Sequence, residues 1–128
     1  MSPCPQAVSN VVYGFATLGW ALGREARAVL EAAVVRVAAS PDMKPQAVSN
    51  ITWAFATLKW EPGTEVRAAL ETAVVRLAQR MNSQNLSNTA WSFATLGLMF
   101  GSEAWAALEA VLVGLCRLTL GCPHVDRA

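Results

Sequence analysis

The chain contains 128 residues, of which 54% are hydrophobic and 15% are charged, and its formal net charge is +1. This length allows one modest domain, and the apolar content is enough for a core and far too high for a disordered chain. The near-neutral charge gives no sign of a strong electrostatic partner, since a tight single-module nucleic-acid binder is normally more basic.

The N-terminal residues 1–5 have neither the basic region nor the apolar core of a secretory signal. The most hydrophobic stretch, residues 104–122, contains Glu109 and Arg117. A membrane span rarely tolerates two such charges, so we expect a soluble protein with no membrane partner. Three cysteines without CxxC spacing are expected to be free thiols in a reducing compartment, namely Cys4, Cys116 and Cys122.

Three copies of one sequence unit cover almost the whole chain. The first block of the unit, Pro-Gln-Ala-Val-Ser-Asn, occurs twice and returns in a looser form as Ser-Gln-Asn-Leu-Ser-Asn, and the block Phe-Ala-Thr-Leu follows each copy. The asparagines Asn10, Asn50 and Asn88 are 40 and then 38 residues apart. This spacing predicts three repeats in one continuous domain, at residues 5–44, 45–82 and 83–122.

Each unit is predicted to form two helices, an A helix followed by a B helix. In the first A helix the apolar positions have the i, i+3, i+4, i+7 spacing of one helical face, at Val8, Val11, Val12, Phe15 and Leu18. Pro5 and Pro45 suit a first helical turn, because proline lacks the N–H that would be unpaired there. Gly19 and Gly97 are predicted to end A helices, and Pro62-Gly63 to break the chain before the second B helix.

The first B helix is predicted from about Arg24 to Ala39, and its Arg27 and Glu31 have the spacing of an ion pair on a solvated face. The second B helix repeats this spacing. No stretch keeps the period of two that is typical of strands. One such hairpin cannot bury its apolar face alone, so the repeats are expected to stack.

The predicted fold is therefore all-α, a short α-solenoid of three helix–turn–helix repeats, for which we expect a right-handed superhelix. The three A helices should stand side by side, with the B helices on the other side. Phe15, Phe55 and Phe93 lie in the middle of the apolar stripes and are expected to be core residues that pack each A helix against its own B helix.

The repeat resembles the octotricopeptide repeats, which are helical-pair repeats of algal and plant organelle proteins. The resemblance rests on Pro-Gln-x-x-Ser-Asn-x-x-Trp-x-Phe-Ala-Thr-Leu at residues 45–58 and on nearly the same block at residues 84–96. It implies binding of single-stranded RNA along a concave surface, in the chloroplast or the mitochondrion. Family members usually carry many more repeats and a transit peptide, whereas here the first repeat begins at Pro5, as expected for a fragment.

A polar column lies opposite the apolar face of each A helix, at positions spaced i, i+4, i+7, i+11. Its members are Gln6, Asn10, Tyr13, Thr17, then Gln46, Asn50, Trp53, Thr57, then Gln84, Asn88, Trp91, Thr95. Amides can read base edges, rings can stack on bases and hydroxyls can reach sugar or phosphate, so these residues are RNA-binding candidates. In the alternative interpretation, the asparagines hydrogen-bond between repeats and the tryptophans pack at repeat junctions.

A residue that is identical in every unit cannot discriminate between bases, so discrimination needs a position that varies. The neighbouring strip of the A helix varies, and it is fully polar only in the third unit, at Asn85, Thr89 and Ser92. These three residues are candidates for base discrimination. Alternatively, positions on this strip adjust close packing.

Phosphate contacts would have to come from outside the A helices, which carry no charged residue in any copy. The nearest basic residues lie in or after the B helices and in loops, at Arg36, Lys44, Lys59, Arg76 and Arg80. They could reach an RNA backbone from the rim, or they could be ordinary solvated charges.

No catalytic or metal-binding set emerges from the sequence. The single histidine, His124, follows Pro123 near the C-terminus, with Cys122 and Asp126 close in sequence but no motif that fixes them as partners. We expect no enzyme activity, no cofactor and no metal.

The last B helix is predicted to be an unfinished interface. Gly114 replaces the arginine of the earlier copies, and the segment is rich in apolar residues, at Val111, Leu112, Val113, Leu115, Leu118 and Leu120. Terminal repeats of a solenoid normally present a polar outer face. A further repeat or a second chain could cover this end, or the helix could be enclosed within the third repeat.

The functional prediction is an RNA-binding helical-repeat module, a fragment of an organelle factor for RNA stability, processing or translation. The alternative is a protein–protein interaction scaffold, because α-solenoids serve that purpose as readily and a fold does not fix a function. The near-neutral charge favours the scaffold, and the recurrent amide–aromatic–hydroxyl column favours RNA.

Overall fold

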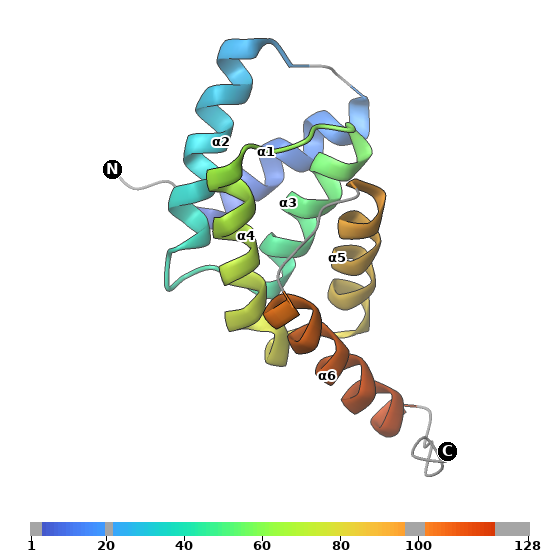
Figure 1. Cartoon of the computed structure of the whole chain (residues 1–128). Helices are drawn as coiled ribbons and strands as arrows, with labels where there is room; N and C mark the ends of the chain where they lie inside the picture. The colour runs from blue at the N-terminus through green and yellow to red at the C-terminus, as the bar shows by residue number, and fades with distance from the viewer. Residues whose placement is uncertain (1–3, 20–21, 97–101, 120–128) are drawn as a thin grey trace.

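The computed structural model describes residues 4–19, 22–96 and 102–119. Within these residues the chain is helical and contains no strand, which confirms the all-α prediction (Figure 1). The elements are α1 (Pro5–Leu18), α2 (Arg24–Ala38), α3 (Pro45–Thr57), α4 (Thr64–Leu77), η1, a single 3-10 turn (Ala78–Arg80), α5 (Ser83–Leu96) and α6 (Ser102–Thr119). Each predicted repeat thus contains one helix pair, with A helices α1, α3 and α5 and B helices α2, α4 and α6.

The A helices begin in two different ways. In α1 and α3 a proline occupies the first turn, and the residue before it makes no side-chain cap. In α5 the side chain of Asn82 accepts a hydrogen bond from the Asn85 backbone N–H (2.7 Å), and the side chain of Asn85 accepts one from the Asn82 N–H (3.3 Å). This reciprocal pair is a capping box, which satisfies two of the N–H groups left open at a helix start.

The end of α1 is a glycine cap, as predicted. Gly19 has φ +67°, in the left-handed region, and its N–H bonds to Ala16 and Phe15 carbonyl groups. The matching position in the second repeat is Lys59, which also has a positive φ of 54°. A lysine there carries a steric cost that glycine avoids. The third member of this position, Gly97, lies outside the described residues.

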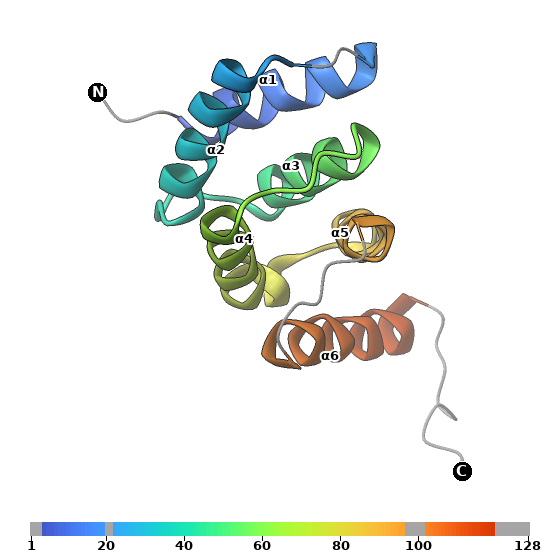
Figure 2. The ribbon, with the colours of Figure 1, turned by 45° about the horizontal axis from the view of Figure 1, so that its top comes forward.

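Helices of one kind pack against each other in chain order. In the A row α1 packs against α3 and α3 against α5, and in the B row α2 packs against α4 and α4 against α6. Figure 2 shows α3 between α1 and α5. The middle A helix therefore has a neighbour on both sides, whereas α1 and α5 each have one.

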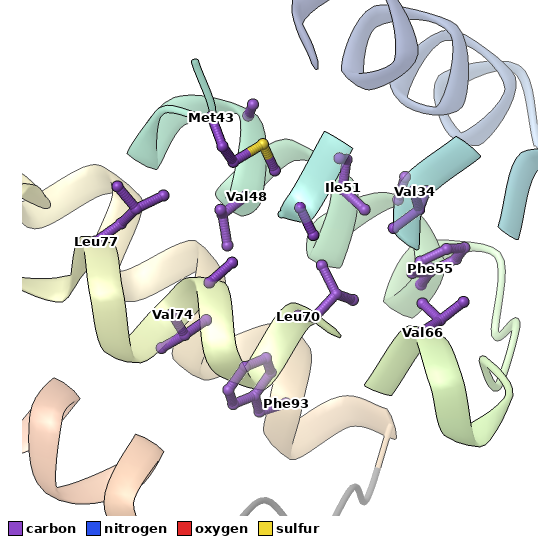
Figure 3. Packing of buried hydrophobic residues seen from close by; sticks show 14 of the residues in the cluster. Val34, Met43, Val48, Ile51, Phe55, Val66, Leu70, Val74, Leu77 and Phe93 are labelled. Atoms are coloured by element: carbon purple, nitrogen blue, oxygen red, sulfur yellow. The ribbon is translucent and has the colours of Figure 1, made fainter. Parts of the chain in front are cut away.

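One hydrophobic cluster runs through all three repeats. Figure 3 shows Val34 of α2 beside Ile51 and Phe55 of α3 and Val66 of α4, all of them fully or almost fully buried. Side chains of the second repeat thus enclose a side chain of the first. The core is built across repeat junctions as well as within each hairpin.

The three phenylalanines are not equivalent. Phe55 and Phe93 are 0% and 1% exposed, as predicted, and the ring of Phe93 meets Trp105 of its own B helix edge-on at 5.7 Å. The prediction was wrong for Phe15, which is only half-buried. It lies on α1, which has no preceding A helix among the described residues, whereas α3 and α5 each follow one.

Burial divides each A helix into faces. At 100° per residue, the polar column lies between two strips that point in opposite directions along the row. The forward strip faces the following repeat and is buried in the first two units, at Ser9, Val12 and Ala16 and at Ser49, Thr52 and Ala56. The backward strip faces the preceding repeat and is buried in the last two units, at Ala47, Ile51 and Ala54 and at Asn85, Thr89 and Ser92.

Candidate functional site

The polar column lies on the outward face of the A helices, between the two packed strips. None of its twelve members is buried: Asn50, Trp53 and Asn88 are half-buried, and the other nine are exposed. Because α1, α3 and α5 are neighbours in one row, the column residues of the three repeats share one side of the molecule. A ligand that followed this row would meet an amide pair, a ring and a hydroxyl on each helix.

Hydrogen bonds within the column run along each helix. The side-chain amide of Gln6 donates to the Asn10 side-chain oxygen (3.1 Å), and Gln84 donates to Asn88 in the same way (3.5 Å). The Thr17 hydroxyl donates to the carbonyl of Tyr13 (2.9 Å). The amides are therefore oriented by their own helices, and among the described contacts no asparagine of the column bonds to the next repeat.

The aromatic members of the column behave differently from one another. Tyr13 and Trp53 stack across the first junction, with ring centroids 4.9 Å apart and planes at 29°. This contact fits the alternative interpretation, in which the rings pack between repeats. Trp91 is 50% exposed. It offers the most accessible indole ring of the column to a ligand.

The candidates for base discrimination are not on this surface. Asn85, Thr89 and Ser92 are 4%, 0% and 0% exposed, because they form the backward strip of α5 against α3. Asn85 also belongs to the capping box, and the Ser92 hydroxyl donates to the Asn88 carbonyl (2.6 Å). Their burial takes them out of reach of a base, and the alternative of close packing describes them instead.

Two arginines of the B helices make structural contacts with a neighbouring repeat. Arg76 of α4 donates from Nη2 to the carbonyl oxygens of Ala38 (2.9 Å) and Ser40 (3.2 Å), which ties it to the end of α2. The guanidinium carbon of Arg27 lies 4.9 Å from the ring centre of Trp60. Such a position gives a cation–π contact. These arginines stabilise repeat junctions.

Lys44 and Lys59 flank the column at the two ends of α3. Lys44 lines a surface hollow together with Gln6, and Lys59 lines another together with Thr57 and Arg27. Both lysines are exposed, as are Arg36 and Arg80. A cation therefore lies at each end of the column of the middle helix, where a nucleic-acid backbone could be contacted.

Arg27 and Glu31 were predicted to form an ion pair on a solvated face; Arg27 is exposed, as predicted, but the carboxylate of Glu31 bonds to the second repeat instead. Glu31 is half-buried and accepts hydrogen bonds from Trp60 Nε1 (2.8 Å) and from the backbone N–H of Gly63 (3.3 Å), the residue that caps α4. Both charged side chains turn toward the loop of the second repeat. The sequence does contain a signal for this contact, namely Trp60 and Gly63 before the second B helix and a glutamate that recurs in every unit.

The described residues contain no group of three or more His, Cys, Asp or Glu side chains that could hold a metal ion. Nor does this part of the chain include a helix long and apolar enough to cross a membrane. His124, Cys122 and Asp126 lie outside the described residues, as does Leu120 of the predicted unfinished interface.

Comparisons of the chain with protein-family models, with curated proteins and with solved structures found no match. The functional interpretation therefore rests on the surface that this chain itself presents.

Proposed function

We propose that this chain is an RNA-binding helical-repeat module, a segment of an α-solenoid with a right-handed superhelix, which binds single-stranded RNA along the polar column. The observation that carries the proposal is the recurrence of one amide–amide–aromatic–hydroxyl set on the accessible face of three adjacent A helices. The resemblance to octotricopeptide repeats points to the same function.

The side chains of the column match what single-stranded RNA offers. Unstacked bases can stack on aromatic rings and hydrogen-bond to amides, and this stacking tolerates any base. Trp91, being half exposed, is the main stacking residue, and Asn88 lies one helical turn before it. Because the variable strip of α5 is buried, binding should show little preference for base sequence.

The RNA backbone would be contacted by Lys44 and Lys59, which flank the column of α3. Phosphate contacts normally supply much of the affinity for a nucleic acid and make it sensitive to salt. Only a few cations are placed in this way, so affinity should be modest and salt-sensitive. Arg76 is excluded from this role because its guanidinium bonds to the end of α2.

By the same resemblance, the module would belong to a factor for RNA stability, processing or translation in the chloroplast or the mitochondrion. It would act by holding RNA and not as an enzyme, without a cofactor.

The test is a fluorescence-anisotropy titration of the protein with random single-stranded RNA at two salt concentrations. We expect binding that weakens as salt rises, and a loss on Trp91→Ala of about 1–3 kcal/mol, the usual value of one stacked base. Thr72→Ala is the matched control, because Thr72 is exposed on the B helix α4. Equal binding by the Trp91→Ala and Thr72→Ala variants would exclude the column as the binding surface.

A protein–protein scaffold remains the second candidate, favoured by the absence of charge from every A helix and by several exposed apolar side chains, including Leu18 and Val29. An absence of RNA binding at low salt would favour this alternative.

A further inference from the structure

The C-terminal repeat ends in an open apolar groove between α5 and α6. It is lined by Leu86 and Ala90 of α5 and by Trp105, Leu108, Glu109 and Leu112 of α6. Leu112 is 56% exposed and Trp105 is 39% exposed. A contiguous apolar patch that is open to solvent can mark an interaction site.

The same positions of the first repeat form a groove that the second repeat fills. The counterpart of Leu112 is Val34 in the first unit and Val74 in the second, and both are 0% exposed. The counterpart of Glu109 is Glu31, which is bonded to the loop before α4. The groove on the third repeat therefore matches the surface that the next repeat covers in the first two units.

The N-terminal repeat presents the opposite half of such a junction. Its backward strip consists of Ala7, Val11 and Gly14, all exposed, with Val11 at 45%. The counterparts of these residues in the second repeat are Ala47, Ile51 and Ala54, which are at most 2% exposed. On the neighbouring B helix α2, Val29 is 63% exposed. A Cβ added at Gly14 would meet no atom within 4 Å, so this strip is open to a partner.

We propose that a second copy of this chain covers these faces, with the groove of one copy seated on the backward strip of the next. The contact would repeat the junction between the first and second repeats. It is head to tail, so each copy keeps one open face and assembly can continue into a chain of molecules. This inference does not depend on RNA binding.

One polar contact of the internal junction can be repeated between copies. The Glu31 carboxylate accepts a hydrogen bond from the backbone N–H of Gly63. Gly63 is the N-cap of α4 and has φ −68° and ψ 170°. Gly23, the N-cap of α2, has nearly the same conformation, with φ −70° and ψ 169°. Glu109 is exposed at the open groove. In a head-to-tail pair the Glu109 carboxylate would accept a hydrogen bond from the backbone N–H of Gly23 of the next copy.

The test is sedimentation velocity of the 128-residue chain from low micromolar concentration up to its solubility limit. We expect the mean sedimentation coefficient to rise steadily with concentration. Val11→Glu blocks the backward strip and Leu112→Glu blocks the groove, and either change should weaken association at least about tenfold by burying an unpaired charge. Thr72→Glu adds the same charge away from both faces and should associate like the unchanged chain.

Mixing the two blocked variants gives the decisive result. The intact groove of Val11→Glu fits the intact strip of Leu112→Glu, so the mixture should form a one-to-one dimer that grows no further. Circular dichroism must show that each variant keeps its helical content. Ala94→Glu changes an exposed position of the forward strip of α5 and serves as a second variant that blocks the groove side. A wild-type monomer at every concentration would overturn the proposal, as would a mixture that stays monomeric.

Discussion

The junction between the first and second repeats and the outward face of the third repeat use the same repeat positions in different surroundings. Val34 at the junction is 0% exposed, and Leu112 at the matching position of the third repeat is 56% exposed. Glu31 at the junction bonds to Trp60 and Gly63, whereas Glu109 is exposed. The local sequence pattern is similar in both places, so the neighbouring repeat decides which apolar position becomes core.

The phenylalanines at one repeat position also differ in burial according to which repeats lie beside them. Phe55 lies on α3, which has an A helix on both sides, and it also meets Trp60 edge-on at 4.6 Å. Phe93 is also buried on α5, which follows α3, whereas Phe15 occupies the matching position on α1, which follows no A helix among the described residues, and it is half-buried. Substitutions at matched positions can therefore measure how much each junction contributes to stability.

The largest effect is expected from Phe55→Ala. Removing a fully buried ring loses its burial and leaves a cavity, which costs about 3–5 kcal/mol. Phe15→Ala should cost clearly less, because part of that ring is already in water. Urea unfolding monitored by circular dichroism measures both changes. Equal losses for the two variants would contradict the claim that packing against a preceding repeat completes the burial of this phenylalanine position.

Glu31→Ala should cost about 1–3 kcal/mol, the usual penalty for leaving a buried donor unpaired, because Trp60 Nε1 would lose its partner. Trp60 is 3% exposed, so water cannot easily replace the carboxylate. Glu109→Ala, at the open end, should change the stability of the monomer by no more than about 0.5 kcal/mol. Thermal melts at low protein concentration compare the two. A larger loss for Glu109→Ala would reverse the roles assigned to the junction and the end.

Asn82→Ala should destabilise the chain by about 1 kcal/mol, the typical value of an N-cap, since it removes one half of the capping box of α5. Lys44→Ala is the matched control, because Lys44 precedes α3 without a side-chain cap. Its effect on the melting temperature should be close to zero. If both variants melted alike, the capping box would not contribute to the start of α5.

The smallest effect is expected at Lys59. Lys59→Gly should raise stability by up to about 1 kcal/mol, because a non-glycine residue at φ 54° carries a steric cost of about that size. Gly19→Ala, at the same repeat position with φ +67°, should lower stability.

Lys59→Gly also tests the RNA proposal. Loss of one phosphate contact should reduce the slope of log binding constant against log salt concentration by about 0.7. An unchanged slope in the more stable Lys59→Gly protein would remove Lys59 from the binding surface.

Several features follow from the sequence alone because they depend on local rules. Pro5 and Pro45 start helices and Gly19 ends one, since missing donors and positive φ are properties of the residue itself. The repeat spacing predicts the helix pairs, and the helical period separates the polar column from the apolar face. The column residues are accordingly exposed or half-buried in all three copies.

Other features depend on which helix lies next to which, and only the tertiary structure decides them. Asn85, Thr89 and Ser92 look like a polar surface strip, but α3 covers them. Arg27 and Glu31 have the spacing of a solvated pair, but the loop of the next repeat turns both toward Trp60. A helical period gives the direction of a side chain and not what occupies that direction, so burial between repeats could not be predicted from the sequence of one repeat.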